Sequence, residues 1–178
     1  MKHIYVNNSL FELFLSSEVI QSRITEMAKD LSTNLKGKNP VFLGILNGSF
    51  MFASDLFKQI SIDAQITFLK LASYQGTNTT GAVKQLIGLN QSITKQNIVI
   101  LEDIVDTGVT LEHIINQLSG YMPASVKIVT LLLKPESYRK NIKIDYVGFE
   151  VPNEFIVGYG LDFDGFGRNS KDIYKIVR

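Results

Sequence analysis

Short apolar runs alternate with longer stretches of helical periodicity over most of the chain. The runs are almost wholly apolar, as expected for strands that are covered on both faces of a parallel sheet. They cover residues 41–46, 66–71, 98–101, 126–133 and 145–149. The first helical stretch begins at Ser16 or Ser17, and Gly37 ends it. The other two cover residues 50–60 and 109–118. This alternation predicts right-handed crossovers and an α/β fold, with a mainly parallel sheet flanked by helices.

The two ends of the chain, about residues 1–15 and 150–178, fit this alternation least well. We expect them to form a small hood over the edge of a core that spans about residues 16–149, within one domain of 178 residues. Residues 73–82 are rich in Ser, Thr, Gly and Asn and have no apolar period. That composition predicts a mobile loop between two strands.

Composition narrows the classes of function. A net charge of +1 argues against bulk electrostatic binding to nucleic acid or to an anionic membrane. The chain has no cysteine and only two histidines, His3 and His113, which excludes thiolate metal sites, a cysteine nucleophile and a histidine-rich metal cluster. The first apolar run is too short for a signal peptide, and no stretch reaches the ~20 apolar residues of a membrane span. We expect a cytoplasmic protein.

Polar residues gather where three of the predicted strands end, and open α/β sheets bind ligands at such ends. The first cluster is residues 47–49, and the last contains Lys134. The middle cluster is the most informative, because a buried strand runs into the adjacent carboxylates of Glu102 and Asp103, and Asp106 follows. Glu102 and Asp103 can accept hydrogen bonds from ribose hydroxyls or approach Mg²⁺.

The residues after these carboxylates suit a phosphate group. Thr107, Gly108 and Thr110 surround a predicted helix start, where backbone N–H groups and hydroxyls can hold a phosphate and a glycine lets it come close. A plainer interpretation is that Asp103 or Asp106 only caps the helix. A cap needs one carboxylate and this segment has three, so we favour a site for a phosphorylated ribose.

The segment LEDIVDTGVT resembles the phosphoribosyl-pyrophosphate (PRPP) motif of the type I phosphoribosyltransferase family at nearly every position. Four other segments resemble this family, in its order: GILNGSFMF, LASYQGT, TLLLKPE and VGFEVPNEFIVGYGLDFDGFGR. The resemblance runs from about Val41 to Arg168 and is closest to members that act on 6-oxopurines such as hypoxanthine and guanine. It implies a five-stranded, mainly parallel sheet, a hood from the chain ends, and purine salvage with PRPP and Mg²⁺, releasing pyrophosphate.

The resemblance also implies roles for individual residues. The general base would be Asp106, and PRPP would be held by Glu102, Asp103, Asp106, Thr107, Gly108, Val109 and Thr110. Pyrophosphate would be held by Leu46, Asn47, Gly48, Ser49 and Arg168. The purine would be bound by Lys134, Phe155, Ile156 and Asp162, and Ser73 and Tyr74 would begin a loop that closes over the site. Magnesium would be approached by Glu102, Asp103 and, at a second ion, Asp162. The Leu46–Asn47 peptide is expected to be cis or to isomerise.

Several of these residues have plainer interpretations. Asp162 would otherwise be a solvated turn acid, Tyr74 a loop tyrosine, and Arg168 and Lys134 ordinary surface residues. Phe155, taken from the sequence alone, is more readily a core residue than a stacking surface.

Two positions depart from the family pattern. Asn47 stands where the family often has Lys, and Val109 replaces a residue that is basic in some members. Neither change removes a backbone donor, so both bear on affinity rather than on the class of reaction.

Two other classes of function stay open. A regulatory RNA-binding protein on the same fold would need a basic concave face, and the near-neutral net charge argues weakly against one. A nucleotide-binding module without catalysis would not need Asp106, Lys134 and Asp162 together.

The preference among hypoxanthine, guanine and xanthine is not determined. Because the three large apolar residues 50–52 cannot all face one core, we also expect a homodimer or homotetramer.

Overall fold

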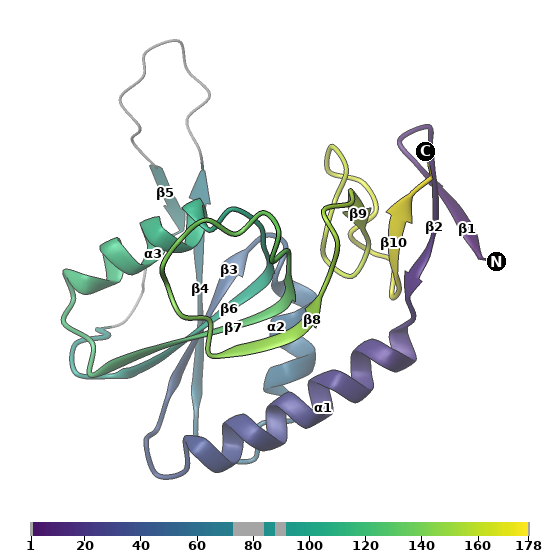
Figure 1. Cartoon of the computed structure of the whole chain (residues 1–178). Helices are drawn as coiled ribbons and strands as arrows, with labels where there is room; N and C mark the ends of the chain where they lie inside the picture. Colours follow the sequence, from purple (N-terminus) through teal and green to yellow (C-terminus); the bar gives the residue numbers. More distant parts are fainter. Residues whose placement is uncertain (1, 73–83, 88–91, 178) are drawn as a thin grey trace.

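A six-stranded sheet forms the centre of the molecule (Figure 1), and the structure, a computed structural model, describes residues 2–72, 84–87 and 92–177. Its strands are β3 (Val41–Leu46), β4 (Gln65–Ala72), β5 (Lys84–Ile87), β6 (Asn97–Val105), β7 (Ser125–Leu133) and β8 (Tyr146–Glu150). They lie side by side in the order β5-β4-β3-β6-β7-β8. Five of these strands run parallel, and β5 pairs antiparallel with β4. The predicted five-stranded parallel sheet is therefore confirmed, with β5 as an addition that the apolar pattern did not predict.

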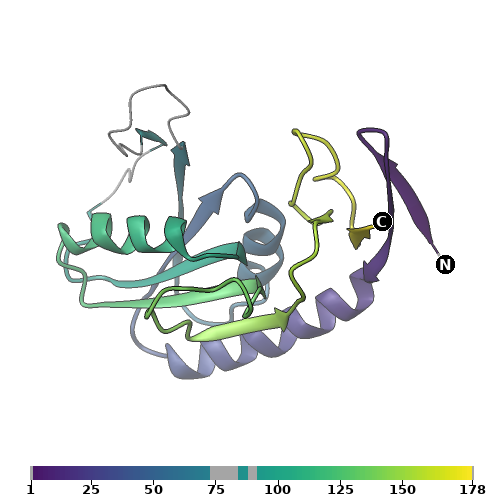
Figure 2. The same cartoon turned by 45° about the horizontal axis from the view of Figure 1, so that its top comes forward.

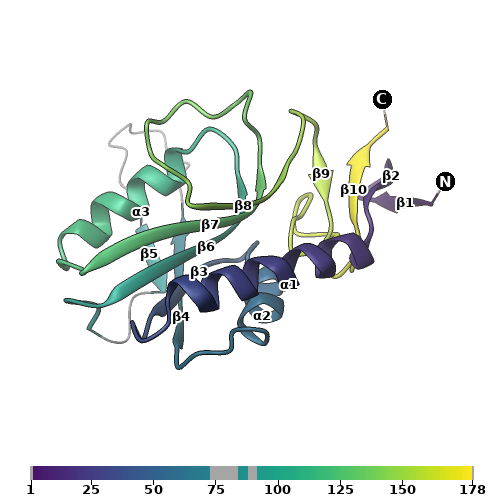
Figure 3. The same ribbon diagram turned by 60° about the horizontal axis from the view of Figure 1, so that its bottom comes forward.

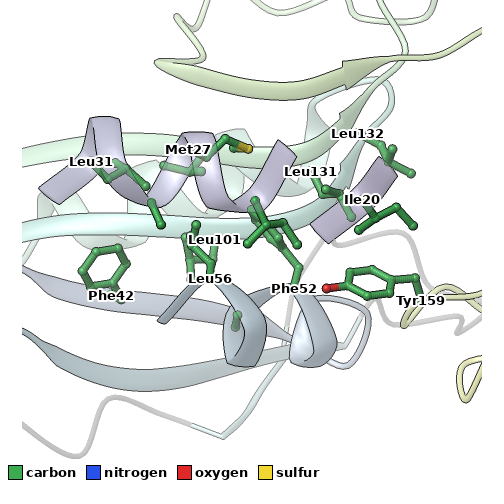
Figure 4. Close-up of a cluster of buried hydrophobic side chains, with 14 of the residues drawn as sticks. Ile20, Met27, Leu31, Phe42, Phe52, Leu56, Leu101, Leu131, Leu132 and Tyr159 are labelled. Atoms are coloured by element: carbon green, nitrogen blue, oxygen red, sulfur yellow. The ribbon is translucent and has the colours of Figure 1, made fainter. Parts of the chain in front are cut away.

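Helices cover both faces of this sheet. α1 (Ser17–Asn34) and α2 (Phe50–Phe57) lie on one face and α3 (Val109–Ser119) lies on the other (Figure 2 and Figure 3). Alternate strand residues point into two buried clusters: on β3, Phe42 joins the cluster under α1 and α2, which Figure 4 shows, and Leu43 joins the cluster under α3. Coverage on both faces explains why these strands are apolar at successive positions.

Two element boundaries differ from the predicted ones by three residues or more. The α-helix of α2 ends at Phe57, short of the predicted residue 60, because Gln59 and Ile60 donate to carbonyls three residues back and so form tighter turns. β6 runs past the predicted residue 101 to Val105, because its pairing with β7 continues to that point. The adjacent carboxylates therefore belong to the strand itself. Within the described ranges, no helix has the length and apolarity needed to cross a membrane.

The two chain ends form a small antiparallel sheet, the hood, in the order β1-β2-β10-β9. Its strands are β1 (His3–Val6), β2 (Ser9–Leu15), β9 (Ile156–Val157) and β10 (Ile173–Ile176). Both termini lie in this part of the molecule (Figure 1). The buried Asp172 ties the hood to α1, because its carboxylate accepts hydrogen bonds from Lys2 Nζ (2.5 Å), Ser17 N (2.8 Å) and the Tyr174 hydroxyl (3.2 Å). The expected hood is confirmed.

Candidate active site

A cavity of about 330 Å³ opens at the carboxyl ends of β3 and β6. The end of β3, the last residues of β6 and the first turn of α3 form its walls. Its lining consists of Ile45, Leu46, Gly48, Glu102, Asp103, Ile104, Val105, Asp106, Thr107, Gly108, Val109, Thr110 and Leu111. The structure thus brings the whole predicted PRPP motif and part of the predicted pyrophosphate loop to one cavity.

The two adjacent carboxylates of β6 line this cavity in a state that resists ionisation. Glu102 is buried, and burial together with the neighbouring Asp103 raises its pKa well above the usual range. Burial also raises the pKa of Asp103 to about 6, although two backbone N–H groups and the Arg168 guanidinium act in the opposite direction. In the part of the chain that the structure describes, no cation or hydrogen-bond donor compensates the Glu102 carboxylate. Such a pair suits an incoming cation or sugar hydroxyl groups.

The loop between β6 and α3 does not use its carboxylates as helix caps. Gly108 precedes α3 with a φ of 85°, and no side chain bonds to the first turn of α3 from this cap position. The Asp106 carboxylate lies 3.3 Å from Lys134 Nζ instead. Thr107 and Thr110 are exposed, and Tyr138 and Lys140 cover Gly108 so closely that a Cβ there would collide with both. The capping interpretation is therefore not supported for Asp106.

Lys134 follows β7 and is buried, with 11% of its side chain exposed, whereas the Asp106 side chain is 47% exposed. The interpretation of Lys134 as a surface lysine is wrong. Because the ion pair joins Lys134 to a cavity-lining carboxylate, the two residues predicted to act on the base lie together.

The predicted pyrophosphate loop follows β3 and packs against the carboxylates. The Leu46–Asn47 peptide is cis, as the resemblance led us to expect. Gly48 lies so close to Asp103 that a Cβ would overlap its carboxylate, so the close approach requires glycine. Ser49 is buried and its hydroxyl donates to the Ile45 carbonyl at 2.7 Å, which holds the turn. Leu46 and Gly48 line the cavity, and Asn47 and Ser49 do not.

Asp162 and Arg168 form an ion pair in the hood segment before β10. Arg168 Nη2 lies 2.7 Å from Asp162 Oδ1, and Arg168 Nη1 donates to the Gly160 carbonyl at 2.7 Å. Asp162 Oδ2 accepts a hydrogen bond from Gly165 N. Neither residue lines the cavity, but both are close enough to shift the pKa of Asp103, Arg168 downward and Asp162 upward. They are therefore engaged with each other and are not freely solvated surface residues.

Phe155 and Ile156 lie in the hood and not in the cavity wall. Phe155 is 43% exposed, so the core interpretation is wrong. Its ring packs edge-on against Phe163, with centroids 5.2 Å apart, and this leaves part of the ring accessible. Ile156 is buried in β9, which pairs with β10. Ser73 and Tyr74 lie outside the described residues.

The expected magnesium ligands are divided between two places. Glu102 and Asp103 line the cavity, and Asp162 is paired with Arg168. Counting only residues 2–72, 84–87 and 92–177, no three acidic or histidine side chains gather closely enough to hold a metal ion by themselves.

Some residues around the cavity were not predicted. The apolar members of the lining, Ile45, Ile104, Val105 and Leu111, look like ordinary core residues, and no pattern in the sequence separates them from the core. The contact of the segment after β7 with Gly108 was also missed. A weak signal for it was the polar, non-periodic run that follows Lys134.

Comparison with known proteins gives concordant results. The profile of the phosphoribosyl transferase domain family matches residues 15–164. The hypoxanthine-guanine phosphoribosyltransferase of Staphylococcus aureus is 42% identical over 165 residues, covering 92% of each chain. The bifunctional protein TilS/HprT of Listeria monocytogenes is 38% identical over 92% of this chain, which spans only 26% of that protein. A crystal structure of a hypoxanthine phosphoribosyltransferase from S. aureus superimposes with a TM-score of 0.88 at 41% identity, covering 93% of this chain and 91% of the other.

Proposed function

Because this chain belongs to the type I phosphoribosyltransferase family, in its hypoxanthine-guanine branch, we propose that it transfers the phosphoribosyl group of PRPP to a 6-oxopurine and releases pyrophosphate. With hypoxanthine the product is inosine monophosphate (IMP). The observation that supports this most strongly is the cavity itself. One continuous stretch, residues 102–110, lines it together with Gly48, and its Asp106 is paired with Lys134.

PRPP is held through its ribose and its 5-phosphate. The exposed hydroxyls of Thr107 and Thr110 and the backbone N–H groups at the start of α3 bind the phosphate, where the helix dipole also favours negative charge. Glu102 and Asp103 accept hydrogen bonds from the ribose hydroxyls. This fixes the anomeric carbon against the base, and such positioning lowers the barrier to reaction.

Mg²⁺ fits the same pair of carboxylates. Mg²⁺ is usually bound by one or two carboxylates together with substrate phosphates. Glu102 and Asp103 offer two adjacent carboxylates at the cavity, and burial raises the pKa of both. When bound with PRPP, the ion neutralises the charge of the leaving pyrophosphate. Asp162 is the candidate for a second ion, once its pairing with Arg168 is released.

The base reacts beside the ion pair of Asp106 and Lys134. A ring nitrogen of the purine forms the bond to the anomeric carbon while the bond to pyrophosphate breaks, through an oxocarbenium-like state. Asp106 takes the ring proton. Lys134 donates a hydrogen bond to the 6-oxygen, and Phe155 stacks on the purine. Ile156 and Asp162 lie along the edge of the purine ring.

The departing pyrophosphate is held by the loop after β3 and by Arg168. Backbone groups of residues 46–49 provide donors, and the guanidinium supplies charge. Asn47 is exposed and adds no charge at this position.

One assay tests the proposal. Purified protein is mixed with PRPP, Mg²⁺ and hypoxanthine or guanine, and nucleotide formation is followed by chromatography. We expect IMP or guanosine monophosphate, lost when PRPP is omitted. If neither nucleotide forms although the protein is folded, the proposal is wrong.

We also propose that the protein acts in the cytoplasm as a homodimer or homotetramer. Phe52 is fully buried, whereas Phe50 is 42% exposed in the isolated chain and is free to contact a second subunit. Sedimentation that shows only monomers at micromolar concentration would exclude the assembly.

A further inference from the structure

Tyr159 occupies an unusual backbone position between the hood and the cavity. Gly158 and Leu161 exchange two backbone hydrogen bonds of 3.1 Å, which closes a two-residue hairpin turn. Both central residues, Tyr159 (φ 49°) and Gly160 (φ 97°), have positive φ. Such turns favour Asn and Gly, so a tyrosine here needs a compensating interaction.

The side chain of Tyr159 supplies that interaction. Its ring lies at the end of the main core cluster, with its hydroxyl directed inward (Figure 4). The hydroxyl donates to Asp55 Oδ2 of α2 at 2.5 Å, and Gln21 of α1 donates to the same carboxylate (2.7 Å) and to the hydroxyl oxygen (3.2 Å). Lys58 Nζ pairs with Asp55 Oδ1 at 2.6 Å. Burial, reinforced by Asp55, raises the pKa of Tyr159, so the hydroxyl keeps its proton.

The same turn packs against the predicted pyrophosphate loop. Gly160 is so close to the Gly48 carbonyl that a Cβ would overlap it. The Gly160 carbonyl also accepts the hydrogen bond from Arg168 Nη1. α2, which carries Asp55, begins directly after Ser49, so the contacts form a closed ring through Gly48, α2, Asp55, Tyr159 and Gly160.

We propose that Tyr159 and Asp55 are positioning residues that hold the pyrophosphate loop and Arg168 in the geometry that binds the diphosphate of PRPP. This role rests on the proposed function. We call these contacts of Tyr159, Asp55, Gly160 and Gly48 the clamp. Most of the residues proposed for the base depend less on it: Ile156 is held by the pairing of β9 with β10, and Phe155 packs on Phe163. Asp162 is the exception, because it follows the turn and is paired with Arg168. Loss of the clamp therefore affects diphosphate-bearing ligands more than the base.

Tyr159→Phe removes only the hydroxyl. We expect KM to rise roughly tenfold for PRPP, and likewise for pyrophosphate in the reverse reaction, while KM for hypoxanthine changes by less than about twofold. Tyr174→Phe is the matched control: Tyr174 is equally buried and its hydroxyl bonds to Asp172, but it lies in β10 and is bonded to the start of α1 through that residue. It should lower the melting temperature and leave all KM values unchanged.

A second pair of variants tests whether the Asp55 carboxylate holds the Tyr159 hydroxyl. Asp55→Asn keeps an acceptor for the Tyr159 hydroxyl and should raise KM for PRPP less than Asp55→Ala does. Calorimetric titration of each variant with magnesium pyrophosphate measures the affinity for the diphosphate without any turnover. If the wild-type chain made no nucleotide, the proposed function would fail, and weaker pyrophosphate binding by Tyr159→Phe than by Tyr174→Phe would still support the clamp. Unchanged PRPP and pyrophosphate values, or an equal rise for hypoxanthine, would overturn it.

Discussion

Replacing Asp103 by Asn should stabilise the folded chain at neutral pH. Asp103 is forced to ionise in a place where burial opposes its charge, beside the more deeply buried Glu102. Asn has the same size and shape, so the close contact with Gly48 is kept, but it carries no charge. The substitution therefore removes a cost that the native carboxylate imposes on folding.

The size of this cost follows from the pKa of Asp103, which burial raises from 3.8 to about 6. At about 1.4 kcal/mol for each pKa unit, this rise corresponds to about 3 kcal/mol of stability lost when the carboxyl ionises. Well below pH 4 the carboxyl is protonated in both the folded and the unfolded state and costs nothing. Between pH 4 and 6 the unfolded chain ionises and the folded chain resists, so stability is lost as pH rises, and above pH 6 the loss is complete.

Thermal unfolding followed by circular dichroism tests this at pH 4 and pH 7.5. At pH 7.5, Asp103→Asn should melt higher than the wild type by roughly 6–12 °C, since 1 kcal/mol corresponds to about 2–4 °C in a chain of this size. At pH 4 the difference should shrink to about 1–2 °C, because only part of the unfolded chain is ionised at Asp103 there. Asp63→Asn, which changes an exposed acid, should show no pH-dependent gain. A gain that is equal at both pH values, or absent at both, would refute the assignment of the cost to Asp103 ionisation.

Three further predictions concern other carboxylates and the lysine. Asp106→Asn should lower kcat by roughly 10²-fold, with little change in PRPP binding measured by calorimetry; a near-normal kcat would remove the general-base role. The kcat/KM of the wild type for adenine should be about a thousandfold or more below that for hypoxanthine, because adenine places a hydrogen-bond donor against the buried Lys134 ammonium. Lys134→Met should lose activity with hypoxanthine and narrow the ratio of the two kcat/KM values. Comparable wild-type kcat/KM values for adenine and hypoxanthine would point to a different base. Burial opposes ionisation of Asp172, but bonds from Lys2, Ser17 and Tyr174 outweigh it and lower its pKa to about 2. Asp172→Asn should therefore cost about 2 kcal/mol in urea unfolding at pH 7, a deficit that shrinks as pH falls from 4 to 2; a constant deficit would contradict this.

The sheet and the phosphate motif could be predicted because their signals are local. Strands buried on both faces require apolar residues at successive positions, and only short runs such as residues 41–46 satisfy this. The three carboxylates of residues 102–106 stand out because an apolar strand runs into them. These carboxylates lie near Gly48 because β3 and β6 are neighbouring parallel strands, so both end at the same edge of the sheet.

The rest depends on contacts between distant segments, which periodicity does not encode. Nothing local to Lys134 says that its ammonium pairs with Asp106 instead of solvent. Phe155 is a large apolar residue of the kind found in cores, and nothing local shows that it lies 43% exposed against Phe163 in the hood. β5 was missed because it is a four-residue edge strand, KQLI, whose two polar and two apolar residues form neither an apolar run nor an alternating pattern.

The uneven distribution of stability around the cavity fits the proposed chemistry. Residues that only hold the fold, such as Asp172, have their charge fully compensated by donors, and their ionisation adds stability. Glu102 and Asp103 are the opposite, because the chain buries both next to each other and supplies too few donors for them. A buried charge without compensation is unfavourable unless something outside the chain completes it. Ribose hydroxyls and Mg²⁺ are groups of the required kind, so binding would recover the free energy that folding leaves unsatisfied at these two residues. For the same reason, Asp103→Asn should be both more stable and a poorer binder of PRPP.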